Sequence, residues 1–234
     1  MFDFITEWLQ QLHSTFIETG YWEFIFIGLG NTLLITVGAV AIGFLLGTFV
    51  AIGKYAAAHN RRLKFIDVIC NVYLAVIRGT PVTVQLMIMF FIIFASVKEG
   101  LWVAILTFGI NSGAYTAEII RSGISSIDPG QEEAGRSLGL SSAQTMMTII
   151  LPQAIKNILP TLGNEFIALI KETSVVSFVG ALDLYVAFSY IGSNSYEFMV
   201  PYIAMALIYI VIVCLITLLV KIMERSLKKS DRRN

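Results

Sequence analysis

Residues 24–53 read FIFIGLGNTLLITVGAVAIGFLLGTFVAIG and contain no charged side chain. As an α-helix this run would be about 45 Å long, which exceeds the ~30 Å hydrocarbon core of a bilayer. A run of this length and composition predicts a transmembrane helix that tilts or projects from the membrane. The chain is therefore expected to be an integral membrane protein.

The composition of the 234-residue chain points to the same class. Hydrophobic residues make up 56% of it and charged residues 14%, whereas soluble domains carry about 25% charged residues. Lys and Arg number 16, as do Asp and Glu, so there is no bulk charge to attract a polyanion. A soluble enzyme, a disordered chain and a nucleic-acid-binding protein are thereby excluded. Cys70 and Cys214 form no metal or disulfide pattern, so no metal site is expected.

Five transmembrane helices are expected: the first at residues 24–53, the second ending at 97 with a start somewhere within 65–80, and the others at 100–117, 157–179 and 198–220. The second must begin before Pro81, because residues 82–97 alone would reach only about 24 Å. We expect Gly79-Thr80-Pro81 to kink it. The fourth is preferred to the neighbouring uncharged run 137–155, whose polar residues and Pro152 favour a loop of short helices. The predicted fold class is an all-α integral membrane protein.

The basic residues predict the orientation of these spans. The connections after the first and third spans hold four and three Lys or Arg residues, and the C-terminal tail holds six. Residues 1–53 and 180–197 hold none. Since basic residues concentrate on the cytoplasmic side, we expect the N-terminus outside and the C-terminus in the cytoplasm. The long polar connection 122–156 is then cytoplasmic.

Three regions are expected along the chain: an extracytoplasmic interfacial helix at 1–23, a transmembrane domain at 24–223 and a basic cytoplasmic tail at 224–234. The first residues are acidic and polar, so no cleavable signal peptide is predicted. A small residue recurs at every fourth position of the first span, and this stripe predicts close packing against another helix. The stripe consists of Ala39, Gly43, Gly47 and Ala51.

Glu165 is the most informative polar residue within an expected span. If that helix begins near residue 157, Glu165 lies about 12 Å in, close to the midplane. A carboxylate there costs at least ~2.5–3.5 kcal/mol and needs a partner, a proton or an aqueous cavity. Asn164 lies beside it, which favours a polar pathway through the bilayer. The alternative is a structural ion pair with Lys171 or Arg78.

The sequence Arg78-Gly79-Thr80-Pro81 predicts a break in the second span. Exposed backbone groups at such a break are tolerated only where they are buried in protein or face water, and they can bind an amino or carboxylate group. The alternative is a kink that shapes the bundle, with Arg78 at the cytoplasmic interface. Glu118 and Arg121 are three residues apart, which predicts an ion pair that anchors the end of the third span.

The cytoplasmic connection has its own helical pattern. Asp128 can cap a short helix over 131–138, which Gly139 ends. Ser141 can cap a second short helix, which we expect Pro152 to break. The two short helices joined by a glycine form either a rigid projection that a partner protein binds or a connector without a binding role.

This loop resembles the EAA loop of binding-protein-dependent ABC importer permeases, through Glu133-Ala134-Gly135, Gly139 and the run Ile149 to Pro152. Gly135 departs from the pattern, which has alanine. Several other stretches resemble the polar amino acid permeases of the histidine, arginine and glutamine type, and the likeness covers about residues 25–225. These stretches are 78–81 with Gln85, 113–118 with Arg121, 130–134, 151–154, 164–167 and 171–174.

The resemblance implies a multi-pass protein of the bacterial cytoplasmic membrane that dimerises with itself or a paralogue. It implies a cytoplasmic ATPase that grips the EAA loop, and an extracytoplasmic solute-binding protein that delivers an amino acid. The implied coupling residues are Glu133, Ala134, Gly135, Gly139 and Leu140. The chain lacks the G-x-x-x-x-G-K-[ST] phosphate loop, so we expect no catalytic residue and no cofactor in it, with ATP and Mg²⁺ bound by the partner ATPase.

The expected mechanism is alternating access, with ATP binding moving the coupling loops. We expect Glu165 and Asn164 to meet an amino or guanidinium group of the substrate, and Gly79 and Thr80 to meet its backbone atoms. A midplane carboxylate favours a cationic side chain: arginine, lysine or histidine. Because it could instead bind the α-ammonium group common to all amino acids, glutamine, glutamate or another polar amino acid is the alternative.

Three other functions are conceivable for a membrane protein with these residues. A secondary transporter would use Glu165 and Glu172 as a proton relay and leaves the helix-Gly-helix loop unexplained. An intramembrane enzyme needs a nucleophile and base or a metal, yet His13 and His59 fall on opposite sides of the membrane and neither H-E-x-x-H nor G-x-S-x-G occurs. A purely structural subunit would not need Glu165 for transport.

Overall fold

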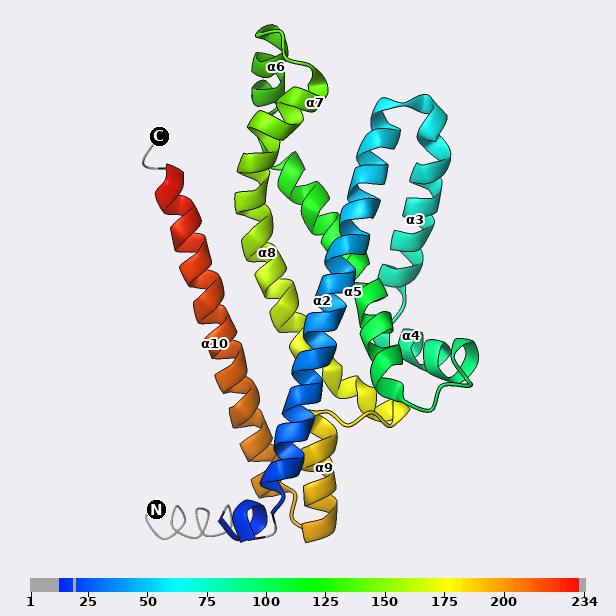
Figure 1. Ribbon diagram of the computed structural model, residues 1–234, viewed down its shortest axis with the longest axis vertical. Coiled ribbons are helices and arrows are strands. Elements are labelled where there is room, and N and C mark those ends of the chain that lie inside the picture. The colour runs from blue at the N-terminus through cyan, green and yellow to red at the C-terminus, as the bar shows by residue number, and fades with distance from the viewer. Residues whose placement is uncertain (1–12, 19, 232–234) are drawn as a thin grey trace. The chain divides into compact units, whose positions relative to one another are not determined.

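The computed structural model describes residues 13–18 and 20–231, and over these residues it contains helices and connecting turns without strands (Figure 1). The longer helices are α2 (Trp22–His59), α3 (Lys64–Gly79), α5 (Gly100–Ser125), α8 (Leu151–Glu172), α9 (Leu184–Ser195) and α10 (Met199–Asp231). The shorter ones are η1 (His13–Glu18), η2 (Arg61–Leu63), α4 (Val82–Ile88), η3 (Met89–Ile93), α6 (Pro129–Ser137), α7 (Ser142–Thr145), η4 (Met146–Ile150) and η5 (Thr173–Val179). Most of the interfacial helix expected at residues 1–23 lies outside the described residues.

Three helices in the described part of the chain are long and apolar enough to cross a membrane, and they are Trp22–Ala58, Gly100–Ser125 and Met199–Leu227. Two bent helix pairs raise the number to as many as five. The pairs are Arg61–Gly79 with Val82–Ile93 and Ser142–Val179 with Leu184–Ser195. The expected spans fall on these three helices and two pairs.

The second expected span is broken more sharply than a proline kink. α3 ends at Gly79, and α4 begins at Val82 after a bend of 106°. Thr80, between them, has extended backbone with φ −124° and ψ 145°. A residue that precedes proline is pushed out of the helical region, so the two helices separate at this point.

The fourth span differs from expectation at both ends. Pro152 does not end the helix, although it has no N–H to bond the preceding turn. The π-helix η4 leads directly into the first turn of α8, with the Leu151 N–H bonded to Met146 O. The short helices expected in the run 137–155 are present, but the second continues into α8 and does not end at Pro152. Beyond α8, the expected connection 180–197 contains the helix α9.

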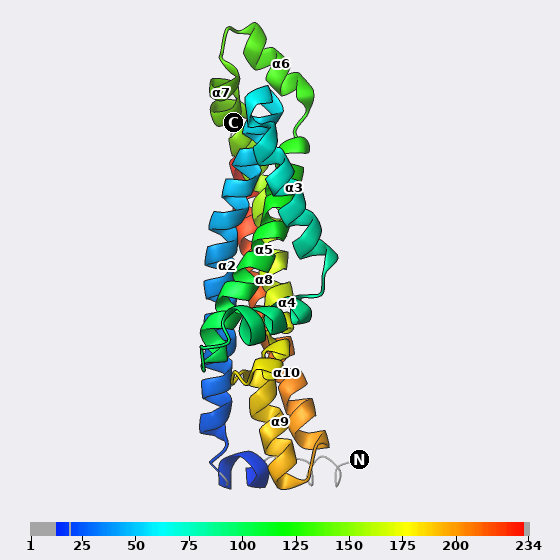
Figure 2. The ribbon, with the colours of Figure 1, turned by 90° about the vertical axis from the view of Figure 1, so that its right-hand side faces the viewer.

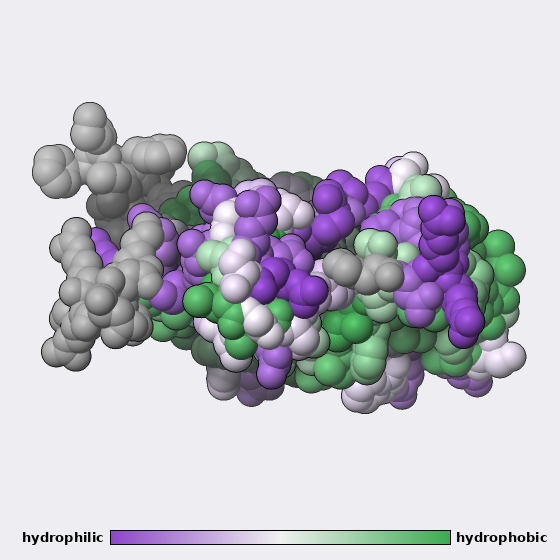
Figure 3. Space-filling model, turned by 90° about the horizontal axis from the view of Figure 1, so that it is seen from above, coloured by the Kyte–Doolittle hydropathy of each residue, from purple (hydrophilic) through white to green (hydrophobic). Residues whose placement is uncertain are grey.

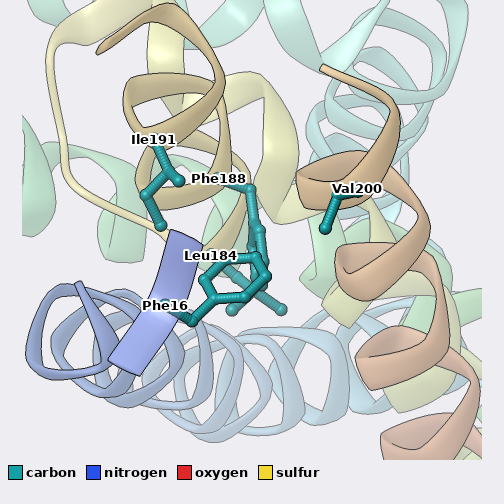
Figure 4. Close-up of a cluster of buried hydrophobic side chains, with 5 residues drawn as sticks. All are labelled: Phe16, Leu184, Phe188, Ile191 and Val200. Atoms are coloured by element: carbon teal, nitrogen blue, oxygen red, sulfur yellow. The ribbon is translucent and has the colours of Figure 1, made fainter. Parts of the chain in front are cut away.

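The chain forms two compact units. The first contains residues up to Ala39, Val82–Phe108 and Leu169–Cys214. Its core joins η1, α9 and the start of α10, and the buried side chains are Phe16, Leu184, Phe188, Ile191 and Val200 (Figure 4). The rings of Phe16 and Phe188 meet edge to face at 5.8 Å.

The second unit contains Val40–Pro81, Gly109–Ala168 and the chain from Leu215. The small residues of α2 fit against α5: a Cβ on Gly43 would lie 2.7 Å from the Ser112 side chain, and one on Gly47 would lie 2.6 Å from Thr116. Only glycine allows so close an approach. The packing role predicted for these two glycines is confirmed.

The predicted helix-Gly-helix loop is also confirmed. Asp128 caps α6 by accepting the Gly130 N–H at 2.8 Å. Gly139 ends α6 with φ +86°, and Ser141 forms a capping box with Gln144 at the start of α7. α6 and α7 form a hairpin beyond α8 (Figure 2). The end of the unit that carries them presents many hydrophilic side chains (Figure 3).

Candidate functional site

A cavity of about 460 Å³ opens within the second unit, among the end of α3, the later turns of α5 and the first half of α8. Most of the residues that line it carry a polar or charged side chain. The side chains that matter for its chemistry are Arg78, Tyr115, Glu118, Arg121, Asn157 and Thr161. A cavity that size is within the range of sites for small molecules.

The charges of the cavity are unequally paired. Arg121 binds Glu118 with two hydrogen bonds, of 2.8 Å and 3.3 Å, so the ion pair predicted from their spacing is confirmed. Arg78 approaches the same carboxylate only to 3.7 Å and lies over the ring of Tyr115 at 5.8 Å. Two guanidinium groups thus approach one carboxylate, and Arg78 is paired with it less closely than Arg121 is. An added carboxylate would find a charge-assisted donor there.

The predicted break lies directly beside Arg78. A Cβ on Gly79 would meet nothing within 4 Å, so its backbone faces open space. Thr80 is exposed, and its hydroxyl donates to Val76 O at 2.8 Å. The break therefore offers accessible backbone next to an available cation. Gly79 and Thr80 adjoin the cavity through Arg78 but do not form its wall.

A polar stripe runs along α8. Asn157, Thr161 and Asn164 are all exposed and lie at i, i+4 and i+7, on one face of the helix. Asn157 donates to Ser126 Oγ at 2.8 Å, which holds the stripe against α5. Glu165 is half-buried beside Asn164, one turn beyond the cavity wall at Thr161. The stripe extends the polar surface of the cavity toward both predicted residues.

Sequence reasoning missed Tyr115 and Thr161 as site residues. Thr161 carried a usable signal, because its spacing from Asn157 and Asn164 marks a polar face on an otherwise apolar helix. Tyr115 carried none, since an aromatic residue in a span is ordinarily a packing residue. The contact of Arg78 with Glu118 joins positions forty residues apart, and no local pattern encodes it.

The predicted coupling residues divide into exposed and buried ones. Glu133, Ala134 and Gly139 are exposed, and Leu140 is half-buried. Gly135 is buried, and a Cβ there would lie 2.6 Å from Thr145 Cγ2. Gly135 therefore lets α6 pack closely on α7 rather than touching a partner. The described residues contain no group of three His, Cys, Asp or Glu side chains placed to bind a metal ion.

Comparison with known proteins identifies the family. Residues 43–229 match the family described as binding-protein-dependent transport system inner membrane component. The arginine transport system permease protein ArtQ of Bacillus subtilis (strain 168) is 38% identical over 211 residues, which cover 89% of this chain and 94% of that protein. A putative glutamine transport system permease protein of Rickettsia typhi is also 38% identical, over 87% of this chain and 93% of its own length.

A solved structure supports the same assignment. The crystal structure of an amino acid ABC transporter with histidines contains a chain that is 42% identical, with a TM-score of 0.82 over 89% of this chain and 96% of that one. The fold is thus that of an ABC permease, a multi-pass inner-membrane protein whose ATPase is a separate subunit. The chain belongs to the binding-protein-dependent transport system inner membrane components, as a permease of the amino acid ABC importers.

Proposed function

We propose that this permease carries basic amino acids such as arginine, lysine or histidine. The observation that carries the proposal is the polar face of α8, which leads from the cavity to a carboxylate at Glu165. A carboxylate at membrane depth favours a cationic ligand. The arginine permease of Bacillus subtilis, 38% identical, supports this choice.

Two ends of the substrate would be bound by different residues of the second unit. Arg78 and the open backbone at Gly79 and Thr80 would receive the α-carboxylate, which every amino acid carries. Glu165 and Asn164 would receive the cationic end of the side chain. Recognition of the common carboxylate and of the variable side chain is thereby assigned to separate elements, α3 and α8.

The second candidate is a glutamine or glutamate permease. It is favoured by the putative glutamine permease of Rickettsia typhi, which is equally similar at 38% identity. In that case Glu165 would bind the α-ammonium group rather than a side chain. A proton-coupled secondary transporter would need no ATPase, and family membership argues against it.

The membrane topology forms part of the proposal. Each bent helix pair would count as one span, giving five, with residues 1–23 outside, the transmembrane permease domain at 24–223 and the tail 224–234 in the cytoplasm. Residues 128–152, which include α6 and α7, would then face the cytoplasm as the coupling loop. Glu133, Ala134, Gly139 and Leu140 would contact the ATPase, with Gly135 shaping the surface.

The proposed assembly has two permease subunits, identical or paralogous, and two cytoplasmic ATPases that bind ATP and Mg²⁺. A solute-binding protein would deliver the amino acid from outside. ATP binding would move the coupling helices and switch the permeases between outward-facing and inward-facing states. The break after Gly79 is a natural point of flexure.

Equilibrium binding to the permease purified with its ATPase tests the substrate class. Labelled arginine is competed with lysine, histidine, glutamine and glutamate, in the wild type and in Glu165→Ala. In the wild type we expect only lysine and histidine to compete with labelled arginine. In Glu165→Ala we expect this competition to be lost. Stronger competition by glutamine or glutamate would select the second candidate, and normal binding by the variant would remove Glu165 from the site. Asp67→Asn, which removes a carboxylate that pairs with Lys54, is the control.

A further inference from the structure

Tyr73 ties α3 to α5 within the second unit. Its hydroxyl group donates a hydrogen bond of 2.6 Å to Ile110 O, a backbone carbonyl 37 positions away in the chain. A carbonyl oxygen has two lone pairs, so Ile110 can accept this bond in addition to one within its own helix. Because the bond joins a side chain of one helix to the backbone of the other, it fixes where α3 stands along α5.

Gly113 makes room for this hydrogen bond. A Cβ at Gly113 would lie 2.8 Å from the Tyr73 hydroxyl oxygen and 3.0 Å from Leu46 Cδ2. Both distances are well inside the ~3.5–4.0 Å of a favourable contact between carbon atoms. A larger residue at this position would therefore push the tyrosine hydroxyl away from the Ile110 carbonyl.

The packing of α3 on α5 continues from this bond toward the candidate site. Leu74, the residue after Tyr73, forms a buried cluster with Ala114 and Ala117 of α5. Arg78 follows one helical turn after Leu74, on the same face of α3. The contact between the two helices thus leads from the Tyr73 hydrogen bond to Arg78.

Arg78 meets its charged neighbour on α5 at long range. Its guanidinium group lies 3.7 Å from the Glu118 carboxylate and 5.8 Å from the centre of the Tyr115 ring. Arg121 binds the same carboxylate at 2.8 Å. A long, partly exposed ion pair contributes little energy, so the place of the Arg78 guanidinium depends on where α3 stands against α5.

We propose that Tyr73 is a positioning residue for substrate binding. Its hydrogen bond to Ile110 sets α3 against α5 and so places Arg78 to receive the α-carboxylate of the amino acid. The inference rests on the proposed function, in which Arg78 binds that group. α3 ends at Gly79, one residue after Arg78, and the chain then bends by 106°. Support for Arg78 along its own helix therefore comes from the preceding turns, where Tyr73 lies.

Equilibrium binding of arginine and agmatine to the ATPase-bound permease tests this role in Tyr73→Phe, which removes only the hydroxyl group. Arginine should bind about threefold to tenfold more weakly than to the wild type, from the net worth of one hydrogen bond, and agmatine, which lacks the α-carboxylate, should change by less than about twofold. Tyr202→Phe, which alters an exposed tyrosine of α10, is the control and should change neither. A Tyr73→Phe variant in which the ratio of the two dissociation constants is unchanged would overturn the proposal.

Gly113→Ala tests the same hydrogen bond from the other helix. The added Cβ should displace the Tyr73 hydroxyl, so the affinity for arginine should fall as it does in Tyr73→Phe. In the double variant there is no hydroxyl left to displace, so the loss of affinity should be smaller than the product of the two single losses. Losses that simply multiply would contradict the proposal.

Arg78→Gln distinguishes a failure of this inference from a failure of the proposed function. If the ratio of dissociation constants changes in Arg78→Gln but not in Tyr73→Phe, the carboxylate site stands and the positioning role of Tyr73 is wrong. If the ratio changes in neither variant, the carboxylate site is wrong, and the positioning role with it.

Discussion

Arg78 shows what a contact between distant positions adds to a local pattern. Its place beside Gly79-Thr80-Pro81 predicts a break in a membrane helix, but the sequence left open whether it anchors an interface or serves a site. In the structure it reaches Glu118 at 3.7 Å, while Arg121 holds the same carboxylate at 2.8 Å. The stronger pairing of Arg121 is what leaves Arg78 available.

Arg78→Gln should weaken binding of arginine about 10- to 100-fold, because a charge-assisted hydrogen bond to the α-carboxylate is worth about 1.5–3 kcal/mol. Binding of agmatine, which lacks that carboxylate, should change little. Equilibrium binding of both ligands to the ATPase-bound permease checks this, with Arg62→Gln, an exposed arginine beside α3, as control. An equal loss of affinity for both ligands would show that Arg78 serves the structure and not the carboxylate.

Among the elements, long apolar helices were predictable from sequence because charges mark their ends. α6 and α7 were predictable because Asp128, Gly139 and Ser141 supply cap chemistry that acts within a few residues. α9 was not, since its twelve residues are too few for a span and no charge marks its start other than Asp183. Continuity through Pro152 depends on the π-helix before it, which has no sequence signature.

The contact of α2 with α5 gives a test of helix packing. Gly47→Leu would place a side chain where a Cβ already lies 2.6 Å from Thr116. Overpacking of this kind costs about 1–3 kcal/mol, so the thermal midpoint should fall by about 2–10 °C. Gly30→Leu on the same helix meets nothing within 4 Å at its Cβ and should leave the midpoint almost unchanged. Equal effects of the two substitutions would mean that α2 does not pack on α5 through Gly47.

Packing of the coupling helices α6 and α7 can be tested with one substitution that disturbs it and a second that should restore it. Gly135→Ala restores the alanine of the EAA pattern, yet its Cβ would lie 2.6 Å from Thr145 Cγ2. We expect this variant to separate α6 from α7 and to lower ATP-driven uptake in proteoliposomes several-fold. Thr145→Ala removes the clashing atoms, so the double variant should regain uptake. Full activity of Gly135→Ala alone would show that the two helices tolerate the extra methyl group.

At the scale of the whole molecule, the charge pattern predicts an orientation that accessibility can measure. In a protein carrying Cys70→Ala and Cys214→Ala, the exposed positions Ser137 on α6 and Ser193 on α9 each receive a single cysteine. A membrane-impermeant maleimide added from outside should label Ser193→Cys but not Ser137→Cys until the membrane is opened. The reverse pattern would invert the topology, and labelling of both would contradict a membrane barrier between them.

The central claim is that Glu165 selects a cationic side chain. Arginine and citrulline differ in carrying a guanidinium or a neutral urea group on the same carbon chain, so the ratio of their dissociation constants isolates that charge. The one measurement we would make is this ratio, by equilibrium binding to the ATPase-bound permease, in the wild type and in Glu165→Gln. The account predicts at least a tenfold preference for arginine in the wild type, about 1.4 kcal/mol, and its loss in the variant. An unchanged ratio in Glu165→Gln, or no preference in the wild type, would contradict it.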